Sequence, residues 1–195
     1  MTNPYPPQQD DALIIVDVQN DFLPGGALAV PEGDTVIPVI NRYIDLFLLA
    51  KRPVFASRDW HPTDHCSFQA QGGPWPLHCV AGTSGANFAA ALQLPAETTV
   101  ISKADTRDKD AYSAFEDTDL DQLLKQQSIK RLFVGGLATD YCVLNTVKDA
   151  LAKNYAVLLL KDAIRAVNVK PDDGLQAEQQ MEALGAQAIT LKQLT

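Results

Sequence analysis

Short apolar runs alternate with amphipathic stretches along almost the whole chain. The runs are rich in Val, Ile and Leu: ALIIV near residue 12, PVFAS near 53, TVIS near 99, RLFVG near 131, AVLLL near 156 and AQAIT near 186. Their length and composition are typical of strands buried in a parallel sheet. Helical patterns lie between them, over residues 34–51 with Asp34 as N-cap, 119–127, 141–153 and 173–184.

This alternation predicts an α/β fold with three layers, α/β/α, in which helices cover both faces of a predominantly parallel sheet. No internal repeat or linker interrupts the chain. We therefore expect one domain over residues 11–195, preceded by a disordered N-terminal tail over residues 1–10.

One stretch, residues 59–95, breaks the alternation. It is too long for an ordinary connection, and it contains all three histidines of the chain and both tryptophans. Loops of this length within a compact domain are usually functional.

Composition narrows the classes of partner. The chain has 195 residues, 46% of them hydrophobic, and a net charge of -8. That charge would repel nucleic acid and anionic membranes but imposes no penalty on a small neutral molecule. The start, MTNPYPPQQDD, lacks the basic and apolar regions of a signal peptide, and no apolar run is long enough to cross a bilayer. The three widely spaced cysteines fit a reducing cytoplasm.

Four side chains with chemical potential stand where predicted strands end. Asp17, Asp59 and Lys103 close the first three strands, and GGLATDY leads from the fourth to Cys142 at a helix start. In an open α/β sheet, ligands bind at the carboxyl ends of the strands. Charged residues also end strands simply because the chain meets water there. Asp17 and Lys103, however, follow deeply apolar runs, where a charge needs a partner.

Cys142 is the candidate nucleophile. A helix N-terminus and the ammonium of Lys103 would favour its thiolate, and Asp17 could take the thiol proton and later pass it to a leaving amine. The alternative is a buried structural cysteine. Cys66 and Cys79 lack comparable neighbours, and we expect both to be structural.

The long stretch carries a candidate metal site. Asp59 and His61 are two residues apart in extended chain, which places their side chains on one side, and His78 completes a set of three. Two imidazoles and a carboxylate suit one divalent ion: zinc first, with iron or manganese also compatible. His65 is a weaker candidate that could instead orient a ligand. Ordinary surface or hydrogen-bonded histidines are the alternative.

Together these segments resemble a known family. The motifs VDVQNDFLPGGALAV, SRDWHP with DHCSF, WPLHCV, YSAF and GLATDYCV are similar to those of nicotinamidases among the isochorismatase-like cysteine hydrolases, in the family's order and over nearly the whole chain. The resemblance implies a catalytic triad and a metal site. The triad is Asp17, Lys103 and Cys142; the metal ligands are Asp59, His61 and His78, with His65 at a position that ligates metal in only some relatives.

The resemblance also implies a substrate pocket lined by Phe22, Trp75 and Tyr112. Aromatic walls suit a flat heteroaromatic ring. Core packing is the alternative for each aromatic side chain, and it is the expected role of Phe115.

A cis peptide bond between Leu137 and Ala138 is a further implication of the resemblance. The amides of Ala138 and Cys142 would then form an oxyanion hole. The implied reaction is hydrolysis of nicotinamide to nicotinate and ammonia through a cysteine acyl-enzyme, within the recycling of nicotinamide into NAD. Pyrazinamide, which keeps the equivalent ring nitrogen, is expected to be a second substrate.

Other functions remain open at this point. A related cysteine amidohydrolase could act on a carbamoyl or ureido compound with the same triad. Vinyl-ether hydrolysis of the isochorismatase type, a binding module without activity and a thiol redox protein fit the residues less well. The sequence shows no heptad repeat or interface patch, so it leaves a homo-oligomer undecided.

Overall fold

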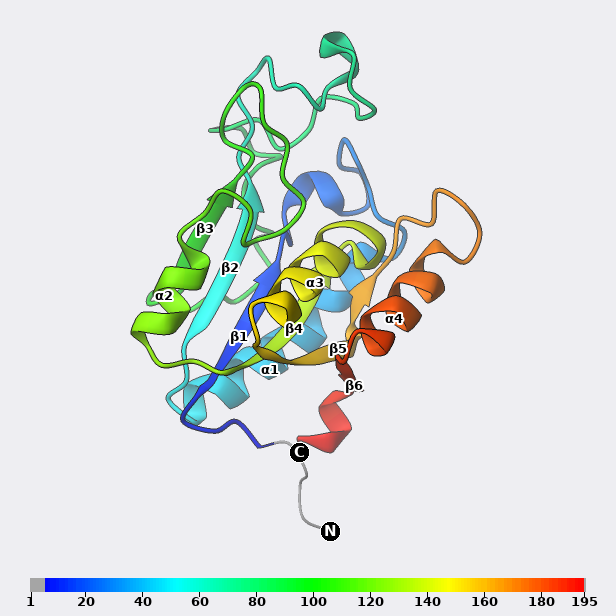
Figure 1. Cartoon of the computed structure of the whole chain (residues 1–195). Coiled ribbons are helices and arrows are strands. Elements are labelled where there is room, and N and C mark those ends of the chain that lie inside the picture. The colour runs from blue at the N-terminus through cyan, green and yellow to red at the C-terminus, as the bar shows by residue number, and fades with distance from the viewer. Residues whose placement is uncertain (1–5, 195) are drawn as a thin grey trace.

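The computed structural model describes residues 6–194 (Figure 1). Its strands are β1 Asp11–Val16, β2 Val54–Asp59, β3 Thr99–Lys103, β4 Arg131–Leu137, β5 Ala156–Arg165 and β6 Gln187–Ile189. Its α-helices are α1 Val36–Leu49, α2 Leu120–Gln126, α3 Leu144–Ala152 and α4 Asp173–Ala183. Every strand and helix predicted from the apolar pattern is confirmed within a few residues at each end.

The six strands form one parallel sheet in the order β3-β2-β1-β4-β5-β6. The chain starts at the centre, builds outward to one edge, returns to the centre and then builds to the other edge. The order therefore reverses between β1 and β4, and a crevice is expected at the carboxyl ends of these two strands.

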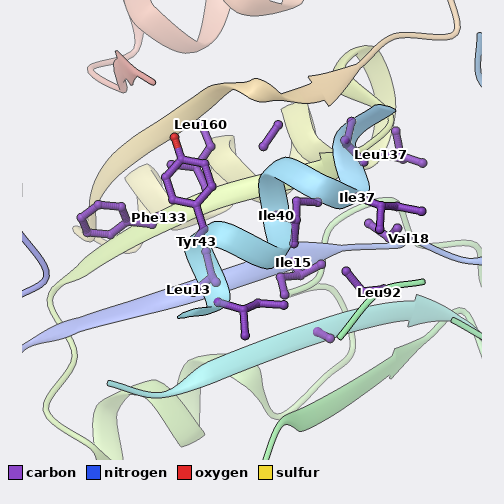
Figure 2. Close-up of a cluster of buried hydrophobic side chains, with 14 of the residues drawn as sticks. Leu13, Ile15, Val18, Ile37, Ile40, Tyr43, Leu92, Phe133, Leu137 and Leu160 are labelled. Atoms are coloured by element: carbon purple, nitrogen blue, oxygen red, sulfur yellow. The ribbon is translucent and has the colours of Figure 1, made fainter. Parts of the chain in front are cut away.

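Residues of β1 alternate between two hydrophobic cores. Leu13 and Ile15 face the core that contains α1, whereas Ile14 and Val16 face the core that contains residues of α2, α3 and α4. Figure 2 shows Ile37, Ile40 and Tyr43 of α1 packed over the first of these faces. The predicted three-layer α/β/α architecture is confirmed.

The segment between β2 and β3, residues 60–98, extends beyond the carboxyl edge of the sheet (Figure 1). Its one short helical turn is Gln69–Gln71. The later part of the segment returns to the first core, where Ala86, Ala89 and Leu92 are buried beside α1. Part of the long stretch noted in the sequence thus lies beyond the carboxyl edge of the sheet, and part of it packs in the first hydrophobic core.

Two helix starts differ from the predicted ones. Asp34 is not an N-cap: it lies in a 3-10 turn, Gly33–Thr35, and α1 begins at Val36 without a side-chain cap. The helix expected from residue 141 begins as a π-helical turn, Thr139–Val143, which continues into α3. Helical periodicity alone does not distinguish such turns from a regular α-helix.

The expected disordered tail, residues 1–10, lies partly outside the described residues, which begin at residue 6. Asp10 is held against the sheet, since its carbonyl oxygen accepts hydrogen bonds from the backbone N–H groups of Lys130 (2.8 Å) and Arg131 (3.1 Å). Across the described residues, no helix combines the length and apolar character needed to cross a membrane.

Gly136 allows β1 and β4 to approach each other at the site. Its φ is +125°, and a Cβ there would lie 2.1 Å from the carbonyl oxygen of Val16. Gly185 has a similar φ of +113° but no atom within 4 Å of its Cβ position.

We predict that Gly185→Ala lowers the free energy of unfolding by about 1–3 kcal/mol from backbone strain alone. Gly136→Ala should cost clearly more, because the clash is added. Urea unfolding of both variants checks this, and equal losses would contradict it.

Candidate functional site

The four side chains predicted at strand ends meet at the carboxyl edge of the sheet, beside the point where the strand order reverses. Asp17 directly follows β1, Asp59 and Lys103 end β2 and β3, and Cys142 lies in the π-helical turn after β4. All four are buried. The parallel register, which pairs Asp59 with Lys103, accounts for this convergence.

The ammonium of Lys103 joins the group. Its Nζ lies 3.0 Å from Oδ2 of Asp17 and donates a hydrogen bond to Oδ1 of Asp59. It also donates to the carbonyl oxygen of Ala111 at 3.1 Å and lies 3.5 Å from Sγ of Cys142. A fully buried lysine is rare, and two carboxylates provide the pairing that burial requires.

Asp17 has one oxygen fixed and one available. The Ser57 hydroxyl donates a 2.6 Å hydrogen bond to its Oδ1. Oδ2 is buried and has no hydrogen-bond partner among the described residues, although the Lys103 ammonium is close. Carboxylate oxygens of Asp17 and Asp59 and the Cys142 sulfur lie within 4.8 Å of one another. Asp17 is therefore placed to accept the thiol proton.

Burial and charge shift the proton affinities of the group. Burial raises the pKa of Asp17, and the nearby Lys103 ammonium only partly offsets this. Burial also raises the pKa of Cys142, with Lys103 acting in the opposite direction and Asp17 adding to the rise. For Lys103, burial favours the neutral amine, but the two carboxylates outweigh it and raise the pKa. Lys103 therefore only partly offsets the effect of burial on the Cys142 thiol, and the Asp17 carboxylate is the neighbouring group that could accept its proton.

Asp59 behaves differently from Asp17. Burial works against its charge, but Lys103 and His61 outweigh burial and lower its pKa. One carboxylate oxygen is bonded to Lys103, and the other lies 3.6 Å from Nε2 of His61. Asp59 thus belongs both to the charged group around Cys142 and to the histidine cluster.

The histidine cluster has the arrangement of a metal site. Ligand atoms of Asp59, His61 and His78 lie within 4.8 Å of one another. Nδ1 of His61 is 2.9 Å from the carbonyl oxygen of Ala104, and Nδ1 of His78 is 2.8 Å from that of Pro76. A carbonyl oxygen can only accept, so each Nδ1 carries a proton, and in the neutral imidazole each Nε2 then offers its lone pair to a metal. This donor set fits a divalent metal ion.

His65 lies beside this group but not in it. Its ring stacks on His61 with centroids 4.2 Å apart. Its Nε2 donates to the carbonyl oxygen of Lys109 at 2.9 Å, and its Nδ1 is 2.7 Å from the Ser67 hydroxyl. With both nitrogens engaged by protein groups, the geometry favours the orienting role over the ligand role.

A pocket opens next to Cys142 and the histidine cluster. The three aromatic residues suggested by the resemblance, Phe22, Trp75 and Tyr112, all line it. Trp75 Nε1 donates to the Tyr112 hydroxyl at 3.0 Å, which fixes the two rings against each other. Phe115, expected in the core, is buried there and stacks on Tyr155.

Several residues that line the pocket were not predicted from the sequence. Tyr141 packs edge-on against Trp75 with centroids 5.1 Å apart, and its place next to Cys142 was a signal that it would be near. Val167 follows β5 in a polar stretch, which gave no such signal. The remaining unpredicted lining residues are Leu28, Val30, Ser67, Asp110 and Ala111.

The backbone that leads to Cys142 matches one expectation. The Leu137–Ala138 peptide bond is cis, as the resemblance implied. The carbonyl oxygen of Ala138 accepts hydrogen bonds from the N–H groups of Tyr141 and Val143, both at 3.1 Å, and so organises the π-helical turn that carries Cys142.

Neither of the other cysteines shares this setting. Both are free thiols: Cys79 is buried and Cys66 partly so. Burial raises the pKa of Cys79 as it does that of Cys142, but Cys79 packs in the first hydrophobic core and does not line the pocket. The expected structural role suits both residues.

Fold and side chains together define an α/β protein whose site has the groups of a thiol-dependent hydrolase. Residues 11–193 match the model of the isochorismatase domain, and the chain belongs to the isochorismatase family.

Individual relatives extend this comparison. The chain is 43% identical to the nicotinamidase of Escherichia coli K12, over 92% of this chain and 94% of that one. Its structure is similar to the pyrazinamidase of Pyrococcus horikoshii in complex with zinc, with a TM-score of 0.90, 47% identity and coverage of 93% and 99%. It is also similar to PnC1 of L. infantum in complex with nicotinate, with a TM-score of 0.88, 36% identity and 96% coverage of both chains.

Removing the central ammonium should destabilise the fold in a pH-dependent way. Lys103→Met leaves two buried carboxylates without a counter-charge, which we expect to cost about 3–5 kcal/mol. Without Lys103 the pKa values of Asp17 and Asp59 in the folded state rise above those in the unfolded state. Between these values the folded protein keeps protons that the unfolded chain has lost, so the loss of stability should grow as the pH rises from 5 to 8. Urea unfolding at both pH values measures this.

Lys125→Met, which breaks an exposed pair with Asp121, is the control and should cost less than about 1 kcal/mol. A pH-independent loss for Lys103→Met would contradict the prediction.

Proposed function

We propose that this protein is a nicotinamidase that hydrolyses nicotinamide to nicotinate and ammonia. The observation that carries the proposal is Cys142, buried beside Lys103 and Asp17, at the wall of an aromatic pocket that also contains an Asp-His-His group. The similarity to a nicotinamidase over most of both chains supports it. The product would enter the recycling of nicotinamide into NAD. We place the reaction in the cytoplasm, where a free thiol nucleophile stays reduced.

Asp59, His61 and His78 would hold one divalent metal ion. Zinc suits this donor set best, and iron or manganese is also compatible; a similar pyrazinamidase has been crystallised with zinc. When bound, the ion would supply a Lewis acid able to accept the lone pair of the substrate's ring nitrogen. Phe22, Trp75 and Tyr112 would hold the flat ring beside it.

The first chemical step belongs to Cys142 and Asp17. The thiol proton passes to Oδ2 of Asp17, and the thiolate attacks the carboxamide carbon. The amides of Ala138 and Cys142 donate to the oxyanion of the tetrahedral intermediate. As the C–N bond breaks, Asp17 returns the proton to the nitrogen, and ammonia leaves behind a thioester on Cys142.

Hydrolysis of the thioester reuses the same groups. Asp17, ionised again, takes a proton from a water molecule that attacks the thioester carbonyl. The C–S bond breaks, nicotinate forms, and the proton returns to the sulfur of Cys142. Lys103 stays charged throughout, because its two carboxylate neighbours raise its pKa, and it stabilises whichever of Asp17 and Cys142 carries the negative charge.

A related cysteine amidohydrolase acting on a carbamoyl compound is the alternative. The triad alone would serve either substrate. The Asp-His-His group beside an aromatic pocket favours a heteroaromatic ring with a nitrogen able to bind metal. Activity of the zinc-loaded protein on N-carbamoyl compounds, with none on nicotinamide, would select the alternative.

The first test is release of ammonia and nicotinate from nicotinamide. We expect turnover by the wild type and none by Cys142→Ala, because Cys142 is the one thiol among the described residues that line the pocket. Cys66→Ala is the matched control and should keep wild-type turnover. Circular dichroism and thermal unfolding establish that both variants fold. Normal turnover by folded Cys142→Ala would refute the covalent mechanism.

The position of the ring nitrogen should decide which amides react. Nicotinamide and pyrazinamide both carry a nitrogen at the position expected to meet the metal, and we predict that both are hydrolysed. Benzamide has the same shape without that nitrogen, so its kcat/KM should be at least tenfold lower. Ammonia release measures all three, and equal values for benzamide and nicotinamide would exclude ring recognition through the metal.

Metal content should separate the roles of the neighbouring histidines. His61→Ala removes a ligand, so the purified protein should retain little zinc by elemental analysis. His65→Ala removes a ring that stacks on His61 but whose two nitrogens bond to protein groups, so it should still bind close to one equivalent at saturating zinc. Unchanged metal in His61→Ala, or loss in His65→Ala equal to that in His61→Ala, would overturn this assignment.

A further inference from the structure

The backbone hydrogen bonds between β1 and β2 stop before they reach Asp59, so the backbone of Asp59 has no main-chain partner in β1. In this ladder the N–H of Leu13 donates to Pro53 and that of Asp17 donates to Ser57, at 3.1 and 3.2 Å. Paired residues run from Leu13 with Val54 to Val16 with Ser57. At Asp17 the chain turns with φ of +48°, and the Asp17 carbonyl oxygen accepts instead from the N–H of Gln19 at 2.9 Å.

The side chain of Gln19 fills the place that β1 leaves. Its Oε1 accepts the N–H of Asp59 at 2.8 Å, and its Nε2 donates to the carbonyl oxygen of the same residue at 2.8 Å. In a parallel ladder that continued, the Asp59 N–H would bond to the Asp17 carbonyl, and the N–H two residues further along would bond to the Asp59 carbonyl. The Gln19 amide therefore supplies both hydrogen bonds of the missing rung.

A third hydrogen bond ties in the long segment. Nε2 of Gln19 also donates to the carbonyl oxygen of Ala86 at 2.8 Å. The backbone around Gln19 pairs with the same region, since Asn20 donates to Asn87 and Ala89 donates to Val18. Gln19 is fully buried, and both N–H bonds of its amide are used. The side chain thus connects the end of β1, the end of β2 and the segment that follows His78.

We propose that Gln19 is a positioning residue for both halves of the site. By replacing the main chain of β1, it lets the backbone turn at Asp17, which directs that carboxylate toward Lys103 and Cys142. At the same time it fixes the backbone of Asp59, whose two oxygens face Lys103 and His61. The inference rests on the roles proposed above for Asp17 and Asp59.

Two substitutions test the device at different strength. Gln19→Met keeps the length and removes all three hydrogen bonds. Gln19→Glu keeps the acceptor for the Asp59 N–H but loses both donors and so leaves two carbonyl oxygens facing a carboxylate. Zinc affinity, measured by competition with a chromophoric chelator, should fall about 10–100-fold in Gln19→Met, as for loss of other groups that orient metal ligands. In the cobalt-substituted protein, the visible d–d bands should shift, because the Asp59 ligand is no longer held.

Asn41 offers a matched control. Its side-chain amide likewise bridges two backbone groups, donating to Ala91 at 3.0 Å and accepting from Gln93 at 2.9 Å, but it lies on α1, away from the site. Asn41→Leu should lower thermal stability without changing zinc affinity or the cobalt spectrum. A fall of zinc affinity in Asn41→Leu would instead show that general destabilisation is enough to weaken the metal site.

The outcomes separate this inference from the proposed function, since metal affinity does not require a known substrate. Weakened zinc binding in folded Gln19→Met, with Asn41→Leu unchanged, supports the inference even if nicotinamide is not hydrolysed. If Gln19→Met does not fold, zinc affinity of Gln19→Glu decides. Zinc affinity within twofold of wild type and an unshifted cobalt spectrum in a folded Gln19 variant would overturn it.

Discussion

The structure of the site depends on one buried lysine between two carboxylates. Lys103 is buried and keeps its charge because Asp17, after β1, and Asp59, at the end of β2, both contact its ammonium. The arrangement is costly to desolvate, and removal of Lys103 alone would leave two buried carboxylates without their counter-charge. The parallel register, the turn after β1 and the reversal of strand order can all be understood as conditions for this contact.

The same contact explains why the two candidate functions of the site are inseparable. Asp59 gives one oxygen to Lys103 and turns the other toward His61. The carboxylate beside the Cys142 thiol, Asp17, and the carboxylate of the histidine cluster, Asp59, therefore contact the same ammonium. A site built this way would position a substrate ring and activate a nucleophile within one rigid unit.

Much of this arrangement could be predicted from the sequence. The strands could be predicted because buried parallel strands are continuous apolar runs. The residues at or after the carboxyl ends of those runs included Asp17, Asp59, Lys103 and Cys142. The structure brings these side chains together, but the sequence could not give the net pKa of Cys142, which depends on how burial balances against Lys103. Nor could it reveal Gln19, because a side chain that replaces a ladder rung leaves no periodic pattern. Asp34 failed as a cap since composition cannot distinguish a preceding 3-10 turn from a helix start.

The stretch after β3 shows how the molecule separates constraint from variation. Carbonyl oxygens of Ala104, Lys109 and Ala111 accept from His61, His65 and Lys103, so one short length of main chain supports both the histidine cluster and the ammonium. These contacts use no side chain of the stretch. The side chains of Arg107, Asp108 and Lys109 are largely exposed, at 62%, 90% and 67%. The outer surface of this stretch is therefore free to change charge and shape during evolution, provided that the backbone path beneath it is conserved.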